Sequence, residues 1–252
     1  MTISHFIKRC ALKTIVVSFA SFGGLATVAF PSFAAQVNFS GWQVSGDVTT
    51  PGVGQANLSN NALLNDDRPQ SDTLFNFSGN PATEALQTPA LQNFLGVAEN
   101  FLDRSGIAFE GSAIRNTIAA QAGDVFRFSY NFLTNETAEA FPFDDYAFFF
   151  VRNADTNEVV NFNALAFPNA ASNPSNPYNT QTGFLSKSFT FSAPGNYTLA
   201  LGVVDVNDYN VSSALQIRDA NLEPVPEPIT IVGSLTALGF GVGLRRRFRK
   251  QA

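Results

Sequence analysis

Apolar and polar residues alternate with a period of two through much of this chain, and this pattern restricts the possible fold more than any other feature of the sequence. In the run FRFSYNF, residues 126–132, aromatic side chains occupy every second position. Alternate positions of a β-strand face the same side, so one row of rings is expected to face a core. The sequence therefore predicts mainly β-structure.

Further runs of this kind follow one another, separated by glycine, proline, asparagine and aspartate, which form turns. We predict a half-buried strand pair over 36–49 and a strand over 72–78, with exposed loops over 50–71 and 168–178. The remaining predicted strands cover 107–119, 124–135, 145–152, 158–167, 184–191, 196–205 and 211–222. About nine strands favour an antiparallel β-sandwich of jelly-roll type.

One short amphipathic helix is predicted over 89–103. Thr88 offers a capping hydroxyl, Pro89 suits the first helical position, and Gly106 follows the end. The apolar residues recur every three or four positions and form one stripe: Leu91, Phe94, Leu95, Ala98, Phe101 and Leu102. The stripe is expected to cover a mouth or edge of a sheet, and a partner-binding helix is the alternative.

The composition of residues 35–224 excludes several classes of function. This segment has seven basic and 19 acidic residues, a balance of minus 12, which repels the phosphates of nucleic acids. The single cysteine, histidine and methionine are Cys10, His5 and Met1, all before this segment. The segment therefore has no disulfide, thiolate nucleophile or histidine triad, and no imidazole or thiolate ligand for zinc or copper.

The first 34 residues have the organisation of a secretory signal peptide. Lys8, Arg9 and Lys13 form a positive region, residues 14–29 are largely apolar, and small residues stand at the positions that a signal peptidase reads. Cleavage is predicted between Ala34 and Ala35. The segment 35–224 is therefore expected to be exported as one β-sandwich domain.

The segment 225–252 reads as a second targeting signal. It begins with the sequence VPEP, continues with an apolar run over 229–244, and ends with a basic tail over 245–250. The arginines Arg245, Arg246 and Arg247 are expected to stay on the cytoplasmic side of the membrane. Sixteen helical residues reach about 24 Å, less than the ~30 Å hydrocarbon core, which favours transient retention over a permanent tail anchor.

This three-part terminus resembles the PEP-CTERM sorting signal of bacterial envelope proteins. The resemblance implies that an exosortase-type enzyme recognises Pro226, Glu227 and Pro228 and removes the membrane helix. The precursor would be held in the membrane, and the processed form would reach the cell surface or extracellular matrix. An ordinary single-span tail anchor is the alternative.

Several short motifs after Phe94 resemble a group of PEP-CTERM surface proteins whose exported part is similar to jelly-roll carbohydrate-binding modules. These motifs are EGSAI (110–114), AGD (122–124), NFLTNE (131–136), DDYAF (144–148), APGNY (193–197), GVVDVND (202–208) and SSAL (212–215). The resemblance implies a topology and a location rather than a defined activity.

Calcium is the metal that the available side chains suit best, because it prefers hard oxygen donors. The candidate donors lie in two loops: Glu136, Asp144 and Asp145 in one, and Asp205, Asn207 and Asp208 in the other. Their spacing is not that of an EF-hand. Solvated carboxylates and turn-forming side chains are the alternative, and a bound calcium ion would be structural.

Aromatic side chains in loops are candidate platforms for sugar rings. Tyr178 and Tyr209 fit this description, whereas Trp42 also fits a place in the core or at a sheet end. We therefore predict a non-catalytic surface or matrix protein that binds exopolysaccharide. A structural or adhesive coat protein without a small ligand is the alternative. A glycoside hydrolase, which needs two suitably spaced carboxylates, is a third reading.

Overall fold

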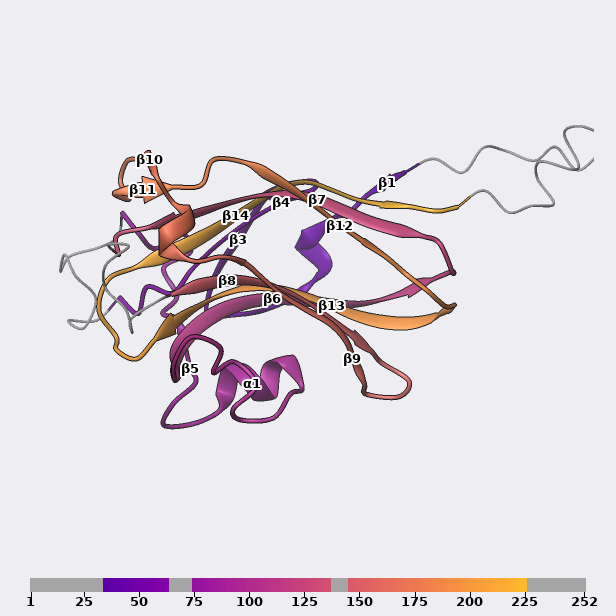
Figure 1. Cartoon of the computed structure of the whole chain (residues 1–252), viewed down its shortest axis with the longest axis horizontal. Coiled ribbons are helices and arrows are strands. Elements are labelled where there is room, and N and C mark those ends of the chain that lie inside the picture. Colours follow the sequence, from indigo (N-terminus) through magenta and orange to yellow (C-terminus); the bar gives the residue numbers. More distant parts are fainter. Residues whose placement is uncertain (1–33, 64–73, 137–144, 226–252) are drawn as a thin grey trace, which may run out of the picture. The chain divides into compact units, whose positions relative to one another are not determined.

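The computed structural model describes residues 34–63, 74–136 and 145–225, in which two antiparallel β-sheets pack face to face (Figure 1). One short helix lies outside the sandwich, beside the lower sheet in this view. The predictions of mainly β-structure, an antiparallel sandwich and one short helix are confirmed. The predicted signal helix and the C-terminal membrane helix fall outside the described residues.

Sheet A follows the strand order β10, β11, β7, β14, β4, β3, with β12 also pairing with β7 and β1 with β14. Its strands are β1 (Ala35–Gln36), β3 (Asp47–Gly52), β4 (Gln55–Ser59), β7 (Val125–Thr134), β10 (Asn173–Pro174), β11 (Thr180–Gln181), β12 (Leu185–Thr190) and β14 (Ser213–Glu223). The strands β7, β12 and β14 correspond closely to predicted runs.

Sheet B follows the order β2, β6, β13, β8, β9, with β5 also pairing with β6. Its strands are β2 (Gln43–Ser45), β5 (Thr83–Glu84), β6 (Ala108–Ala120), β8 (Tyr146–Asn153), β9 (Val159–Ala166) and β13 (Gly195–Val206). The elements outside the sheets are the helix α1 (Ala90–Leu95) and two single 3₁₀ turns, η1 (Phe39–Gly41) and η2 (Pro168–Ala170).

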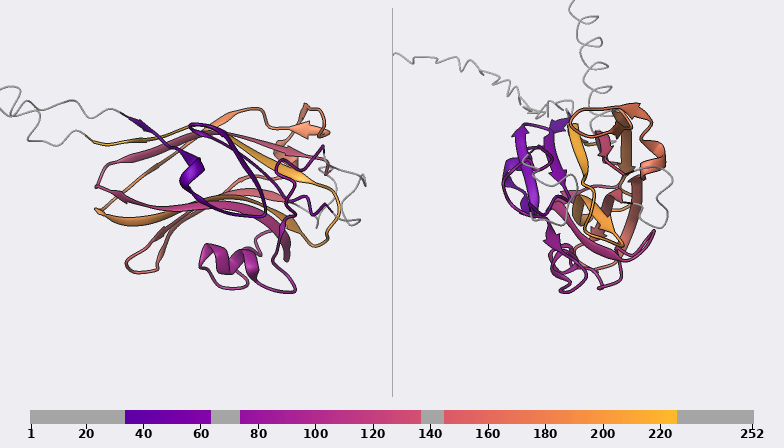
Figure 2. Two further views of the ribbon diagram at one scale, coloured as in Figure 1. Left: turned by 180° about the vertical axis from the view of Figure 1, so that it is seen from behind. Right: turned by 90° about the vertical axis from the view of Figure 1, so that its left-hand side faces the viewer.

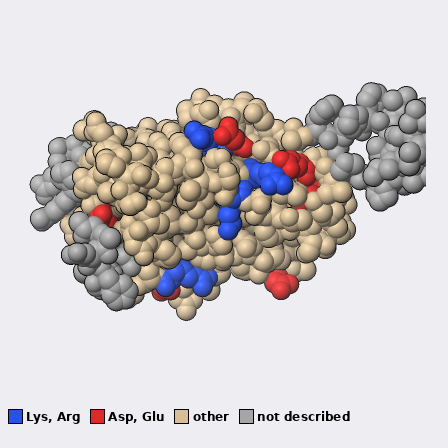
Figure 3. All heavy atoms as spheres, turned by 45° about the horizontal axis from the view of Figure 1, so that its top comes forward, with Lys and Arg blue, Asp and Glu red and all other residues tan. Residues whose placement is uncertain are grey.

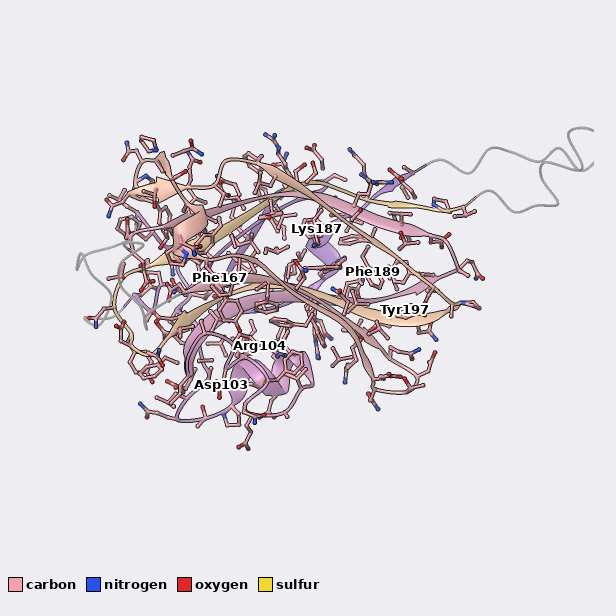
Figure 4. All side chains as sticks on the ribbon, viewed as in Figure 1. Asp103, Arg104, Phe167, Lys187, Phe189 and Tyr197 are labelled. Carbon is pink, nitrogen blue, oxygen red and sulfur yellow. The ribbon has the colours of Figure 1, made fainter. Side chains whose placement is uncertain are left out.

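The core between the sheets is built from the alternating rings of β7. Phe126, Phe128 and Phe132 are almost fully buried. Phe149 of β8 meets them from the other sheet, with ring centroids 5.6 Å from Phe126 and 5.2 Å from Phe128. Figure 4 shows Phe189 on β12 and Tyr197 on β13, which extend the same cluster. The predicted inward row of aromatic side chains is confirmed.

The predicted helix over 89–103 is much shorter in the structure, where α1 covers Ala90–Leu95. Gly96 ends it by adopting the left-handed conformation (φ 72°, ψ 41°), and its N–H donates to the carbonyls of Asn93 and Gln92. Pro89 occupies the N-cap position, and no side chain caps the helix. The chain continues through turns to residue 103, so helical spacing was correct only for the first part of the stripe.

The apolar stripe nevertheless covers a sheet, on its face rather than at its edge. Leu91, Leu95 and Leu102 pack on the outer surface of sheet B against Phe148 and Phe150 of β8. The end-on view in Figure 2 shows α1 beyond sheet B, with the hairpin of β3 and β4 at one side of the sandwich. One part of the outer face of sheet B is therefore unavailable to a ligand.

The exposed loop predicted over 50–71 is wrong for its first part. Residues 55–59 form β4, which pairs with β14 inside sheet A and buries Ala56 and Leu58. The positive φ of Gly54 (73°) turns the chain between β3 and β4, and no Cβ opposes that conformation. Asparagine and glycine around these two small apolar positions concealed the strand pattern.

The strand predicted over 72–78 is also wrong for its described residues, which form turns. The amide groups of Phe77 and Ser78 donate to the carboxylate of buried Asp47, at 2.8 and 2.7 Å, instead of to a neighbouring strand. The same carboxylate accepts a hydrogen bond from the Ser59 hydroxyl. The side chain of Asn76 also accepts hydrogen bonds from the N–H groups of Ser78 and Gly79, so two side chains hold the backbone of this segment.

Candidate functional site

The outer side of sheet A carries polar side chains at the positions that alternate with the core residues. Because Phe126, Phe128 and Tyr130 point inward, Arg127, Ser129 and Asn131 point outward. We call this surface the sheet A face: Asn57, Arg127, Ser129, Asn131, Ser186, Ser188, Gln216 and Arg218. Figure 3 brings this side forward and shows few charged groups, with basic and acidic atoms adjacent near the middle.

A row of amide side chains crosses the sheet A face. The strand register places Gln216 of β14 opposite Asn131 of β7 and Asn57 of β4. The Asn131 amide donates to Oε1 of Gln181 at 2.8 Å and to Oε1 of Gln216 at 3.3 Å. These contacts bury Asn131 and leave Gln181 and Gln216 half-buried. The row therefore fixes the orientation of several donors and acceptors at the surface.

A polar hollow of about 280 Å³ lies beside this row, lined mainly by Arg127, Ser129, Ser186, Ser188, Asp219 and Asn221. Ser186 and Ser188 stand opposite Ser129 and Arg127 in the pairing of β12 with β7. A register shift in β14 between Arg218 and Asn221, with a positive φ at Asp219 (57°), brings Asp219 and Asn221 to the rim. Hydroxyl, guanidinium, carboxylate and amide groups thus converge on one space.

The hydrogen bonds of Arg127 and Asn221 determine which of their polar atoms remain for a ligand. Arg127 donates from Nε to Oε2 of Glu223 at 2.8 Å, and both side chains are about half exposed. Oδ1 of Asn221 is buried and accepts no hydrogen bond from the described residues. This acceptor is oriented but shielded from solvent, so a ligand hydroxyl or a water molecule reaches it only where neighbouring side chains move aside.

An exposed aromatic ring lies on the same face as the polar hollow, although it does not line it. Phe184 is 39% exposed, and the Arg218 guanidinium lies 3.6 Å from its ring centroid. Arg218 stands opposite Ser129 in the sheet register, and Ser129 lines the hollow. This pair of flat groups provides a surface on which an apolar ring face can stack.

The aromatic side chains that the sequence singled out are placed differently. Tyr178 is 2% exposed, so the prediction that its ring projects from an exposed loop is wrong. Its hydroxyl donates to the Phe75 carbonyl at 2.9 Å, and its ring meets the Phe75 ring edge-on at 4.9 Å. The loop over 168–178 is thus folded back, and its residues 173–174 form the edge strand β10.

Trp42 is 8% exposed and packs edge-on against Phe39, as expected for a core or sheet-end residue. Tyr209 is half-buried, with its ring 4.9 Å from that of Phe109 and its hydroxyl 3.0 Å from Oε1 of Glu84. Neither residue borders the polar hollow described above. Sequence reasoning missed Phe184 because it stands at the start of a strand run rather than in an obvious loop.

The two loops predicted to hold calcium do meet at one end of the sandwich. The backbone N–H of Asp145 donates to Oε2 of Glu136 at 3.3 Å, and Oδ1 of Asp145 accepts from the Val206 N–H at 3.1 Å. Asp205 stands opposite Glu110 in the sheet register, and both are buried. The structure therefore brings Glu136, Asp145 and the β13 loop together.

Several of these groups serve internal hydrogen bonds. Oδ1 of Asn207 accepts from the Ile107 N–H, and Oδ1 of Asp208 accepts from the Asn210 N–H within its own turn. In the described part of the chain, no group of three or more carboxylate, histidine or cysteine side chains is arranged to hold a metal ion. Asp144 lies outside that part, so the calcium site stays a prediction.

Polar residues that sequence reasoning did not select surround Asp145. Its Oδ2 accepts from Nδ2 of Asn60 at 2.8 Å, and Oδ1 of Asn60 accepts from the Ser213 N–H at 2.6 Å. Burial is the main cause that raises the pKa of Asp145 to about 8, and the negative charge of Asp208 adds to it. At neutral pH, Asp145 is therefore mainly protonated in the folded protein.

The predicted targeting residues are not part of this geometry. Pro226, Glu227, Pro228 and the tail arginines Arg245, Arg246 and Arg247 lie outside the described residues. Over residues 34–63, 74–136 and 145–225, no helix has the length and apolar character needed to cross a bilayer. The predicted signal cleavage between Ala34 and Ala35 falls just at the start of β1 and stays a prediction.

No protein-family model and no curated protein sequence matches this chain. Among solved structures, it is similar to the carbohydrate-binding module TmCBM61 in complex with β-1,4-galactotriose, with 12% identity over 75% of this chain and 91% of that one and a TM-score of 0.34. A xylan-binding CBM22 domain from Paenibacillus barcinonensis has 10% identity over 78% and 97%, with a TM-score of 0.30.

A cleaved adhesin domain of Lys-gingipain from Porphyromonas gingivalis has 9% identity over 77% of this chain and 99% of that one, with a TM-score of 0.33. These are distant likenesses of a β-sandwich fold.

Proposed function

We propose that this chain is an exported, non-catalytic protein that binds glycan on the sheet A face. One observation carries the proposal: the polar hollow, with its convergent hydroxyl, amide and guanidinium groups, shares a face with the exposed Phe184–Arg218 pair, and Arg218 stands opposite Ser129 of its lining. A sugar ring has hydroxyl groups around its edge and patches of C–H on its faces. It needs both kinds of surface together, and the sheet A face supplies both.

The hydrogen-bonding capacity of the polar hollow suits hydroxyl groups. The hydroxyls of Ser129, Ser186 and Ser188 can each donate and accept, so they tolerate either direction of a sugar hydroxyl. Oδ1 of Asn221 is an acceptor without a donor among the described residues. Arg127 is held in place by Glu223, which orients its remaining N–H groups. The protein therefore presents a prearranged surface rather than a flexible one.

Binding without hydrolysis fits this hollow. Glycoside hydrolysis uses a pair of carboxyl groups about 5–9.5 Å apart on either side of the scissile bond. Among the described residues that line the polar hollow, Asp219 supplies the one carboxylate, and its side chain is 72% exposed. That exposed group lacks both a partner acid and the burial that would tune its protonation for catalysis.

A glycan array followed by titration calorimetry tests the binding function. The purified protein is expected to bind at least one polysaccharide class, and Phe184→Ala and Asn221→Ala are each expected to weaken that binding about tenfold, because each removes one good contact. Val53→Ala is the matched control, since Val53 is an exposed apolar residue in the turn between β3 and β4, away from the polar hollow. An array without any binding would overturn the proposal.

A structural or adhesive coat protein is the second candidate, and the burial of Tyr178 and Trp42 favours it. Buried rings contribute to the core and offer nothing to a small ligand. This candidate predicts no saturable glycan binding but retains display at the surface. The same array therefore separates the two functions.

We further propose that the chain is exported with cleavage after Ala34, held by the apolar segment 229–244, and then processed near Pro226–Pro228 by an exosortase-type enzyme. The support is the order of these segments in the sequence. Processing would leave the β-sandwich at the cell surface or in the extracellular matrix.

Changing Glu227 to alanine tests this sorting step in the native host. The proline residues on both sides stay, so the restrictions that they place on the backbone are retained, while the charge that an enzyme can recognise is lost. The full-length chain is expected to accumulate in the membrane fraction, as seen by immunoblotting of fractionated cells. Lys250→Ala is the control, and normal processing of the Glu227→Ala chain would contradict exosortase recognition.

A further inference from the structure

Two arginines lie side by side on the outer face of sheet B, away from the proposed glycan surface. Arg115 of β6 stands opposite Ala200 of β13, and Arg152 of β8 stands opposite Thr198 of the same strand. Ala200 and Thr198 are two positions apart and therefore share a face, so the two guanidinium groups do too. They border a hollow of about 370 Å³, which we call the arginine hollow.

The lining of the arginine hollow contains no acid. Besides Arg115 and Arg152, the lining residues are Gln43, Asn116, Thr117 and Thr198. Two arginines on the other sheet, Arg127 and Arg218, form ion pairs, with Glu223 and Asp219 respectively. Residues 35–224 have 19 acidic and seven basic side chains, so two arginines together without a carboxylate are unusual in this chain.

Neutral groups hold both arginines in place. Nε of Arg115 donates to Oε1 of Gln43 at 2.9 Å, and its guanidinium lies 4.7 Å from the ring centroid of Phe94. Nη1 of Arg152 donates to the Gly96 carbonyl and to Oδ1 of Asn157, each at 3.1 Å. A Cβ at Gly96 would lie 2.8 Å from Nη1 of Arg152, so only glycine permits this approach. The helix α1 thus contacts Arg115, and the turn after it contacts Arg152.

The two positive charges repel one another. Burial lowers the pKa of Arg115, and the charge of Arg152 lowers it further. Nε of Arg152 is buried without an acceptor among the described residues. The hydroxyls of Thr117 and Thr198 lie 2.9 Å apart on strands that border the hollow, so one donates to the other and one proton remains for a ligand. An oxyanion would relieve the repulsion between the two guanidinium groups and accept hydrogen bonds from their free N–H groups and from that hydroxyl.

We propose that the arginine hollow binds a carboxylate or sulfate group. If the proposed glycan-binding function holds, this group is a charged substituent of the polysaccharide, either a uronic acid or a sulfate ester. The acidic surface of the rest of the domain would repel such a polymer elsewhere. The hollow would therefore decide which acidic glycans are retained and in what orientation.

Titration calorimetry at constant ionic strength tests this proposal with sodium sulfate, glucuronate, tetragalacturonate and neutral glucose. The wild-type protein is expected to bind the three anions through this site and to show no such binding of glucose there. The double variant Arg115→Gln/Arg152→Gln is expected to lose at least tenfold in affinity for each anion. The double lysine variant keeps the charges but loses the planar fork, and is expected to lie between the two.

Arg104→Gln is the matched control, because the Arg104 guanidinium also lies 4.7 Å from a phenylalanine ring, that of Phe101, but does not line the arginine hollow. Figure 4 shows Arg104 below sheet B near α1. Thermal unfolding in chloride buffer shows whether each variant is folded. Equal anion binding by the wild type and the double glutamine variant, or none by the wild type, would overturn the site.

The arms of the experiment separate this site from the sheet A face and distinguish the sources of the anion. Tighter binding of tetragalacturonate than of free sulfate supports a glycan substituent, whereas equal binding overturns the glycan assignment and leaves a site for free anions. Neutral glycan binding that depends on Phe184, together with an unresponsive arginine pair, would leave the proposed function intact and remove this inference. If the wild-type protein binds sulfate at the arginine pair but binds no glycan, the anion site stands and the proposed glycan-binding function is removed.

Discussion

Replacement of Phe149 by alanine is expected to lower the free energy of unfolding by about 3–5 kcal/mol, the usual cost of removing a buried phenylalanine side chain. Phe149 is fully buried, and its ring contacts those of Phe126, Phe128 and Phe189. Its removal leaves a cavity between the two sheets that the closely packed neighbouring strands fill only in part. Urea unfolding with an unchanged slope would report this loss as a lower midpoint.

Phe184→Ala is the matched control, and it connects stability to function. Its ring is 39% exposed and contacts the Arg218 guanidinium, so its loss is expected to cost under about 1 kcal/mol. Removal of the Phe149 ring should therefore lower stability strongly, whereas removal of the Phe184 ring should mainly lower the affinity for glycan. Equal destabilisation by the two substitutions would contradict the assignment of Phe149 to the core and Phe184 to the surface.

The sandwich could be predicted from the sequence because its long strands alternate regularly. The inward rings of Phe126, Phe128 and Phe132 occupy every second position, and β7 follows that period closely. The β4 strand was not predicted because its inward residues, Ala56 and Leu58, are flanked by turn-forming residues. Its strand conformation depends on pairing with β14, which is distant in sequence.

The candidate sites were harder to predict, because they also depend on the pairing of strands that are distant in sequence. Ser129 and Ser186 are 57 positions apart, and only the register of β7 with β12 places them together. Arg115 and Arg152 lie on strands separated by β13, so their proximity depends on sheet order. The sequence did indicate that Asp145 and Asp208 stand in loops, but not that both loops meet at one end. Local residue patterns predict where strands form, but the pairing of strands distant in sequence determines which side chains meet in a candidate site.

The amino-acid composition of the loop before Tyr178 led to the wrong prediction that this ring is exposed. The loop contains three adjacent pairs of proline and asparagine, at 168–169, 173–174 and 176–177, which favour exposed turns. A buried acceptor, the Phe75 carbonyl, satisfies its hydroxyl and allows the ring to be buried in the loop cluster with Phe75 and Leu133. An aromatic residue in a loop is therefore a candidate for binding only when no such partner is available inside the protein.

The stability of the protein is expected to fall as the pH rises from about 4 to about 8, because Asp145 is buried. Its pKa is about 8 in the folded state, against 3.8 for an unperturbed aspartate. Between these values the unfolded chain releases the proton and the folded chain keeps it, so each pH unit costs about 1.4 kcal/mol. Below pH 3.8 both states are protonated, and above 8 both are ionised, so the effect levels off.

The variant Asp145→Asn is expected to flatten this dependence. Burial also raises the pKa of Asp47 and Asp208, so the wild-type slope has further contributions of the same sign. The difference between wild type and variant, measured by urea unfolding at pH 5, 6 and 7, isolates the contribution of Asp145. The variant is expected to be less stable at pH 5, since its amide N–H₂ would face the N–H donors of Asn60 or Val206.

Phe149→Ala is the control here, because it lowers stability without removing a titrating group and should keep the wild-type dependence of stability on pH.

Adding calcium to the same unfolding experiments tests the predicted calcium site, since an ion coordinated by Asp145 requires the ionised carboxylate. Saturating calcium chloride would then raise the stability at pH 7 and flatten the wild-type profile, but not change that of Asp145→Asn. An unchanged wild-type profile would mean that Glu136, Asp144, Asp145, Asp205, Asn207 and Asp208 hold no calcium, and that a neutral buried acid accounts for the slope. A parallel slope in Asp145→Asn and wild type would contradict the role of Asp145 itself.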